Sequence, residues 1–173
     1  GRARVVKEIN IGTKNEKMIV LEECIVKKAI TILVRGGSSI IVEEAKRCLH
    51  DALCVVRNMI IDPRIVYGGG ATEISCSLHV EEKADSTPSI EQYAIRAFAE
   101  ALDVIPIALA ENSGYNGIEY LANLKNKQKK DNIAAYGVDC LKQGTNQMSV
   151  QGVYEGYNSK KQQLQLATQV CKM

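Results

Sequence analysis

The sequence predicts a mainly α-helical fold with a small β portion. Two observations lead to this prediction. Apolar residues recur three and four positions apart in long stretches after residue 38, which is the spacing of one helix face. Short β-branched runs of strand length gather instead before residue 36. With 173 residues, 46% hydrophobic and 5% aromatic, the chain can bury one sizeable core or two small ones.

The β portion is expected at the start of the chain. Three β-branched runs, at residues 5–9, 18–21 and 29–34, predict three strands. Gly12 and Asn15 lie between the first two runs and favour a turn there.

A long amphipathic helix is predicted to follow. Ser38 or Ser39 can cap its start, and Pro63 ends it. Its apolar positions follow helical spacing and predict a continuous buried stripe, made of Ile41, Ala45, Leu49, Ala52, Val56 and Ile60.

Two further helices are predicted in the middle of the chain, over residues 71–82 and 89–112. In the second, Ser89 followed by Gln92 resembles a capping box. Small and aliphatic residues surround this helix, so we expect burial on most of its sides. Pro106 should kink or interrupt it.

The last third of the chain predicts shorter elements. Gly114 and Gly117 separate the long helix from an amphipathic helix over residues 118–130. Residues 136–146 have glycines at their bends and predict a hairpin or an extended loop. Residues 160–173 are helical in character. The chain therefore opens in a strand pattern and closes in a helix pattern, as expected of a piece of a longer protein.

Charge and cysteine content narrow the function classes. A net charge of +2 does not favour nucleic acid as a partner, and the basic cluster at residues 125–130 is interpreted as a solvated helix face. The six cysteines form no CxxC pair and have no histidine at zinc-ligand spacing, so no metal ligand is assigned. No apolar run is long enough to cross a bilayer and no signal peptide is recognised, so we expect a cytoplasmic protein without a membrane partner.

The chemically suggestive residues are Asp51 and a glycine run, Gly68, Gly69 and Gly70. An aspartate can orient water, and a bare glycine backbone can approach phosphate, so together they suggest half of a nucleotide-hydrolysing site. Other interpretations remain open at this point. From the helix pattern alone, Asp51 is better explained as a surface residue, and the glycines also suit a tight turn that leads into a helix.

Four motifs in order make the resemblance to a known family plain. The motifs are His50-Asp-Ala-Leu-Cys-Val-Val-Arg-Asn, Tyr67-Gly-Gly-Gly-Ala-Thr-Glu-Ile-Ser, Ala110-Glu-Asn-Ser-Gly and Gly137-Val-Asp-Cys-Leu-Lys-Gln-Gly-Thr-Asn. With these motifs, the chain resembles the C-terminal part of group II chaperonin subunits, the eukaryotic cytosolic ring chaperones, and is most similar to their epsilon class.

The resemblance implies a division into three domains. Residues 1–36 would end the substrate-facing apical domain, residues 37–65 would form an intermediate-domain helix, and residues 66–173 would form the C-terminal part of the equatorial ATP-binding domain. The complete subunit would be an ATPase in a hetero-oligomeric double ring of paralogous subunits. Its clients would be unfolded cytosolic proteins of the actin and tubulin class, and ATP hydrolysis would close the chamber. The alternative is a non-catalytic helical fragment that retains ring-contact surfaces only.

The resemblance also implies roles for individual residues. Asp51 would position the water that attacks the γ-phosphate, and the glycine run would form the phosphate-side loop. A carboxylate can accept from two hydroxyls, so Glu155 would accept from the ribose. The remaining implied nucleotide contacts are Gly137, Asp139 and Cys140 along the adenine and Lys160 at the same rim.

The implied ligands are ATP or ADP with Mg²⁺. The family's Gly-Asp-Gly-Thr loop does not occur in these 173 residues, and neither does a P-loop pattern. Magnesium would therefore be held mainly by the N-terminal half of the complete subunit. By itself, the chain is expected to hold part of a site and not to hydrolyse ATP.

Overall fold

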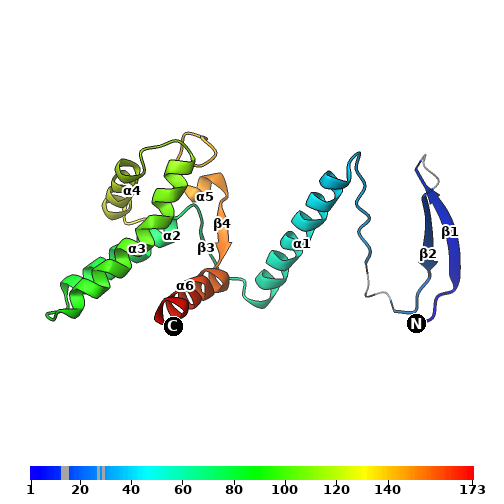
Figure 1. Cartoon of the computed structure of the whole chain (residues 1–173), viewed down its shortest axis with the longest axis horizontal. Coiled ribbons are helices and arrows are strands. Elements are labelled where there is room, and N and C mark those ends of the chain that lie inside the picture. Colours follow the sequence, from blue (N-terminus) through cyan, green and yellow to red (C-terminus); the bar gives the residue numbers. More distant parts are fainter. Residues whose placement is uncertain (13–15, 27, 29) are drawn as a thin grey trace. The chain divides into compact units, whose positions relative to one another are not determined.

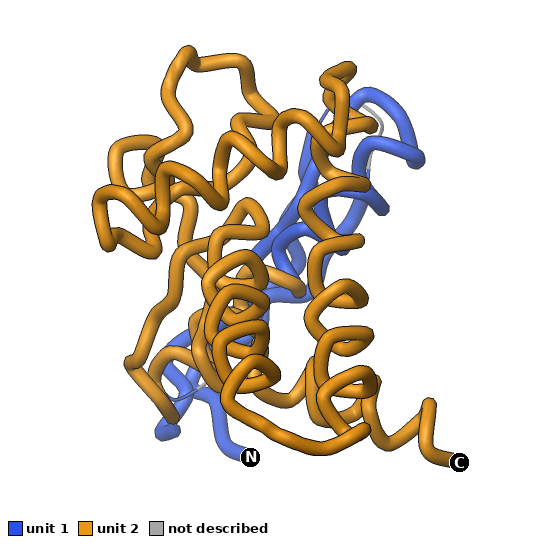
Figure 2. Tube along the Cα trace, turned by 90° about the vertical axis from the view of Figure 1, so that its left-hand side faces the viewer, with its two compact units in different colours: residues 1–50 blue, residues 51–173 orange. Residues whose placement is uncertain are grey.

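The computed structural model describes residues 1–12, 16–26, 28 and 30–173. These residues form two compact units, residues 1–50 and residues 51–173, coloured separately in Figure 2. The helical prediction is confirmed, because most elements of the second unit are helices (Figure 1).

The first unit contains an antiparallel hairpin. Strand β1 (Val5–Ile11) pairs with β2 (Glu16–Glu22) in a register that places Val5 opposite Glu22. The first two predicted strands are therefore confirmed. The third is wrong: residues 30–34 form no strand, and Ala29 lies outside the described residues. A strand needs a hydrogen-bonded neighbour, and β1 and β2 are paired with each other in a two-stranded sheet.

Helix α1 (Ser39–Ile61) begins in the first unit and ends in the second. The hydroxyl of Ser38 accepts from the backbone N–H of Ile40 at 3.3 Å, which supports the predicted start. The predicted burial of the apolar stripe is wrong, because no residue of α1 is buried and Ile60 is 78% exposed. The spacing fixed which side chains share a face, but the described residues supply no element that covers that face.

Three helices form the core of the second unit (Figure 1). Helix α2 (Ala71–Asp85) packs against α3 (Glu91–Asn112), and α4 (Gly117–Asp131) contacts both. The buried cluster consists of Ile74, Leu78, Ala110, Leu124 and Val138.

Helix α3 differs from its prediction in its burial. It runs through Pro106 as one element, so of the two predicted effects Pro106 causes no interruption, and a kink there stays a prediction. The expected burial on most sides is wrong: Leu102 and Ala110 are buried, but Tyr93 is 69% exposed and Val104 is 60% exposed. One face of α3 therefore meets the core.

Short elements complete the second unit. Strand β3 (Ile65–Tyr67) pairs antiparallel with β4 (Tyr154–Gly156), and helix α5 (Met148–Gln151) precedes β4. None of these three was predicted, because three or four residues are too few to display a period. A bridge between Tyr136 and Gln147 closes the predicted loop. Helix α6 (Tyr157–Lys172) follows, and no helix of the described part is long and apolar enough to span a membrane.

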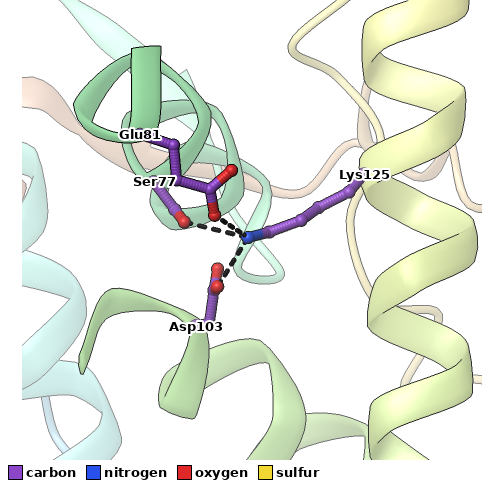
Figure 3. A network of polar contacts seen from close by, with 4 residues as sticks. All are labelled: Ser77, Glu81, Asp103 and Lys125. Atoms are coloured by element: carbon purple, nitrogen blue, oxygen red, sulfur yellow. Dashed lines mark hydrogen bonds and ion pairs between the residues drawn. The ribbon is translucent and has the colours of Figure 1, made fainter. Parts of the chain in front are cut away.

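A polar network joins the three core helices (Figure 3). Lys125 Nζ of α4 lies 2.6 Å from Asp103 Oδ2 of α3, and it lies 2.7 Å from Glu81 Oε1 and 3.1 Å from Ser77 Oγ of α2. The solvated-face interpretation of residues 125–130 is therefore wrong for Lys125, although it holds for Lys127, Lys129 and Lys130, which are exposed.

Candidate functional site

The glycine loop, Gly68–Gly70, connects β3 to α2. Gly69 and Gly70 have φ angles of +64° and +75°, in the left-handed region that glycine adopts without a Cβ penalty. The N–H of Gly68 donates to the carbonyl of Val153 at 3.1 Å, which ties the loop to the segment before β4. The loop therefore makes a tight turn between a strand and the first core helix.

Packing also requires glycine in this loop. A Cβ on Gly69 would lie 2.6 Å from Met148 Sδ, and one on Gly70 would lie 3.0 Å from Pro106 Cβ. The interpretation as a tight turn leading into a helix is thus confirmed, and Pro106 has a packing role beneath it. Phosphate approach by the same backbone is compatible with this geometry and stays a prediction.

The predicted hairpin loop lies directly against the glycine loop. The N–H of Val138 donates to the carbonyl of Gly69 at 2.8 Å. A Cβ on Gly137 would lie 2.8 Å from the same carbonyl oxygen. Buried Gln128 of α4 donates to the carbonyls of Ala71 at 3.1 Å and Tyr136 at 2.8 Å. It therefore links the residue after the glycine loop to the start of the predicted hairpin loop.

Asp139 is turned into this loop rather than outward. Its side chain is buried, and its carboxylate accepts from the N–H groups of Gln143 and Gly144 and from Gln151 Nε2. Burial acts to raise the pKa of Asp139, but these hydrogen bonds outweigh it and lower the pKa below its ordinary value. Asp139 therefore stabilises the loop, whereas its neighbour Cys140 is exposed.

Glu155 meets the glycine loop through the β3–β4 pair. The strand register places Glu155 opposite Val66, and a Cβ on Gly68 would lie 3.4 Å from Glu155 Oε1. The other carboxylate oxygen, Oε2, lies 2.5 Å from Lys160 Nζ in the first turns of α6. Sequence reasoning placed Glu155 and Lys160 at one rim, and the structure brings them into contact.

The sequence analysis missed Glu73, which completes this cluster. Glu73 is 2% exposed in the first turn of α2, and its Oε1 lies 2.6 Å from Lys160 Nζ. The available signal was a carboxylate within the otherwise uncharged stretch that follows Gly70. Burial acts to lower the pKa of Lys160, but its bonds to Glu155 and Glu73 outweigh it and raise the pKa. Lys160 is therefore held as a cation.

A hollow of about 600 Å³ lies beside Glu155 and Lys160. The end of α1 contributes Val55 and Met59 to its lining, and Asp62 follows directly after the helix. Asp51 lies on the same helix stripe as Val55 and Met59, because Val55 follows it by four residues and by about 6 Å along the axis at ~1.5 Å per residue.

Asp51 itself is exposed. In the described part of the chain, no hydrogen bond or ion pair joins Asp51 to the glycine loop, Glu155 or Lys160. The described residues also contain no group of three or more histidine, cysteine or acidic side chains that could hold a metal.

Comparison with known proteins places this arrangement in a family. The sequence pattern of the TCP-1/cpn60 chaperonin family matches residues 1–173. T-complex protein 1 subunit epsilon of Encephalitozoon cuniculi (strain GB-M1) is 46% identical over 173 residues, which are 100% of this chain and 32% of that protein. A thermosome subunit of Methanothermococcus thermolithotrophicus is 40% identical over 100% of this chain and 31% of its own. The expected resemblance, including that to the epsilon class, is confirmed.

A solved structure is also similar. The open-state monomer of a group II chaperonin from Methanococcoides burtonii matches with a TM-score of 0.69 and 34% identity, over 97% of this chain and 41% of that one. The chain spans about a third of the length of the curated relatives it matches.

Proposed function

Since the chain belongs to the TCP-1/cpn60 chaperonin family, we propose that it is part of an ATP-dependent chaperonin subunit that assists protein folding in the cytosol. The complete subunit joins paralogous subunits in a hetero-oligomeric double ring and receives unfolded clients of the actin and tubulin class. ATP hydrolysis drives closure of the chamber. The domain division at residues 36 and 65 belongs to this proposal.

One observation supports the nucleotide site most strongly. Glu155 Oε1 lies beside the backbone of Gly68, and the loop containing Gly137 is hydrogen-bonded to Gly69. These are the residues assigned to ribose, phosphate and adenine by their motifs, and the Gly137 and Glu155 segments follow the glycine loop by about 70 and about 90 positions in the sequence. Such convergence of polar groups around a strand-to-helix turn suits nucleotide binding.

In this proposal each group has a separate task. Glu155 accepts from ribose hydroxyls, the glycine loop lies on the phosphate side, and residues 137–140 lie along the adenine. Asp51 accepts a hydrogen bond from the attacking water and holds it in line with the γ-phosphate, because phosphoryl transfer depends on positioning. Mg²⁺ would be held mainly by residues of the rest of the subunit and would neutralise phosphate charge.

The test is ATP affinity of the complete subunit with Glu155→Gln. We expect the dissociation constant to rise about tenfold, because a charged acceptor for hydroxyls is replaced by a neutral amide. Glu91→Gln is the matched control, since Glu91 is an exposed glutamate at the start of α3. Equal affinities for the wild type and Glu155→Gln would overturn the assignment of Glu155.

A second candidate function is a non-catalytic interaction module. It is favoured by apolar side chains left uncovered on three helices, among them Ile60 of α1, Val104 of α3 and Val170 of α6, each at least 60% exposed. The two candidates differ in one measurement: only the first requires ATP turnover that disappears with Asp51→Ala.

A further inference from the structure

We propose that Glu73 is a positioning residue for the nucleotide: through Lys160 it orients the carboxylate of Glu155 toward the ribose. This inference rests on the proposed function, because it assigns a task to a residue behind the proposed ribose acceptor. It concerns three side chains from α2, β4 and α6, called the carboxylate–lysine relay below: Glu73, Glu155 and Lys160.

The relay is a continuous chain of short contacts. Lys160 Nζ lies 2.6 Å from Glu73 Oε1 and 2.5 Å from Glu155 Oε2. The side chains of Glu73 and Lys160 are 2% and 12% exposed, whereas that of Glu155 is 37% exposed. The relay therefore runs from a buried anchor to a side chain that a ligand can reach.

The two oxygens of Glu155 have different surroundings. Oε2 is held by Lys160, and Oε1 faces the glycine loop, 3.4 Å from the position of a Cβ on Gly68. In the part of the chain that the structure describes, no hydrogen bond to Oε1 is found. Oε1 therefore retains its acceptor capacity for a hydroxyl placed beside the loop.

Glu73 explains why Lys160 stays in this position. A lysine has a flexible stem and a strongly hydrated ammonium, so a single contact to a half-exposed carboxylate would not keep it out of water. A buried carboxylate is costly without a cation, so Glu73 attracts the ammonium inward. Lys160 then reaches Glu155 from a fixed point and restricts the rotamers of that side chain.

The burial pattern argues for more than stability. Replacing a buried ion pair by apolar residues is often neutral or stabilising, so such a pair is weak evidence for a purely structural role. Glu73 Oε2 is also buried without a hydrogen-bond partner among the described residues. Burying Glu73 and Lys160 therefore has a free-energy cost. A role in orienting Glu155 explains why the protein keeps these charges buried.

The experiment measures discrimination between ATP and 2′,3′-dideoxy-ATP by the complete subunit. A wild-type subunit that uses Glu155 binds ATP more tightly than the dideoxy analogue. With Glu73→Gln, which keeps the side-chain shape but removes the charge, we expect this preference to shrink about tenfold. A merely structural role would weaken both nucleotides equally and leave their ratio unchanged.

Glu81→Gln is the matched control. Glu81 lies on the same helix and also pairs with a lysine, Lys125, at 2.7 Å, but in the network of Figure 3. We expect Glu81→Gln to keep the wild-type preference for ATP.

A second variant tests the route of the effect. Lys160→Met breaks the relay at its central residue, and it should reduce the preference as much as Glu73→Gln does. In the double variant the two effects should not add, since Glu73 acts through Lys160. If Glu73→Gln does not fold, Glu73→Asp replaces it, because the shorter side chain keeps the charge but reaches less far toward Lys160; an unchanged preference for ATP in Glu73→Asp would overturn the proposal.

The outcomes separate this inference from the proposed function. If the wild type does not prefer ATP, or if Glu155→Gln retains the preference, the ribose assignment fails and the relay fails with it. If Glu155→Gln loses the preference while Glu73→Gln and Lys160→Met retain it, the relay alone is wrong.

Discussion

The glycine loop region and helix α1 differ sharply in how they are held. Around Gly69, backbone hydrogen bonds to Val138 and Val153 and the side chain of Met148 determine the geometry from several directions. Asp51, by contrast, lies on a helix that has no buried residue. The proposed nucleotide-holding groups therefore lie in the packed part of the second unit, whereas the proposed catalytic group, Asp51, lies on an exposed surface of the same unit.

Because of this difference, nucleotide binding and ATP hydrolysis depend on different groups in the proposed site and can be tested separately. Groups in a packed region are preorganised and cost little to order when a ligand arrives. In the proposed site, a side chain on an exposed helix can act only when that helix is brought to the phosphate, as in enzymes whose domains close over substrate. The following predictions test each side of this division.

The largest effect is expected from Asp51→Ala in the complete subunit. Hydrolysis should fall at least a hundredfold, because positioned acid–base groups contribute about 10² to 10⁴ in rate. ATP affinity should stay within about tenfold, since Asp51 acts on water in the transition state. Single-turnover hydrolysis and equilibrium binding measure the two separately. Asp62→Ala is a poor control because Asp62 lines the hollow beside Glu155. Glu44→Ala in α1 serves instead, because Glu44 lies outside that hollow and its pair with Arg47 is exposed. Near-normal hydrolysis would remove Asp51 from the mechanism.

On the binding side, Gly70→Val should destabilise the second unit by about 4 kcal/mol. A residue at φ +75° has left-handed strain of about 1 to 2 kcal/mol, and contact with Pro106 adds overpacking of about 1 to 3 kcal/mol. Nucleotide affinity should fall with stability.

Gly114→Val provides the comparison for this prediction. Its φ is +87°, and a Cβ there meets nothing within 4 Å, so only the strain remains. Urea unfolding should place Gly114→Val about 2 kcal/mol below the wild type. Equal losses for both variants would mean that Pro106 exerts no constraint on the glycine loop.

The sequence predicted those features that depend on local interactions. Helix spacing predicted α1 to α4 because the repeat is read within one segment. Pairs such as Lys160 with Glu73 join residues 87 positions apart, and a single sequence contains no signal for that pairing. The strand β4 was missed because three residues have no period, yet its register with β3 places Glu155 beside the glycine loop.

The site residues themselves came from motif resemblance, and the structure tests only their proximity. It assembles Gly68, Gly137, Glu155 and Lys160, but it turns the carboxylate of Asp139 inward to its own loop. The burial errors on α1 and α3 have a different cause. Amphipathic spacing identifies a face that can be covered, but the partner that covers it is not encoded in that helix.

The core network gives a smaller expected effect. Lys125→Met would leave Asp103 and Glu81 without their cation, and Asp103 Oδ1 already lacks a partner among the described residues. We expect a loss of about 2 kcal/mol, below the usual range for fully buried pairs because Glu81 is partly exposed. Urea unfolding of Lys129→Met is the control, since Lys129 is exposed on the same helix. If both variants match the wild type, the network does not stabilise the helix packing.

The smallest effect is expected from Asp139→Asn, which should cost about 1 kcal/mol at neutral pH. Both carboxylate oxygens accept hydrogen bonds, so an amide nitrogen would face a donor such as the N–H of Gly144. The folded-state pKa of Asp139 is lowered, so its stabilising contribution is present above the ordinary value of 3.8 and is lost as pH falls through the folded pKa. The difference in unfolding free energy between the wild type and Asp139→Asn should therefore be constant between about pH 5 and 8, and it should shrink below about pH 4. Asp85→Asn, which removes an exposed pair with Arg96, should show a smaller difference throughout. If the difference in unfolding free energy between the wild type and Asp139→Asn stays the same in strong acid, then the charge of Asp139 does not stabilise the loop that contacts Gly69.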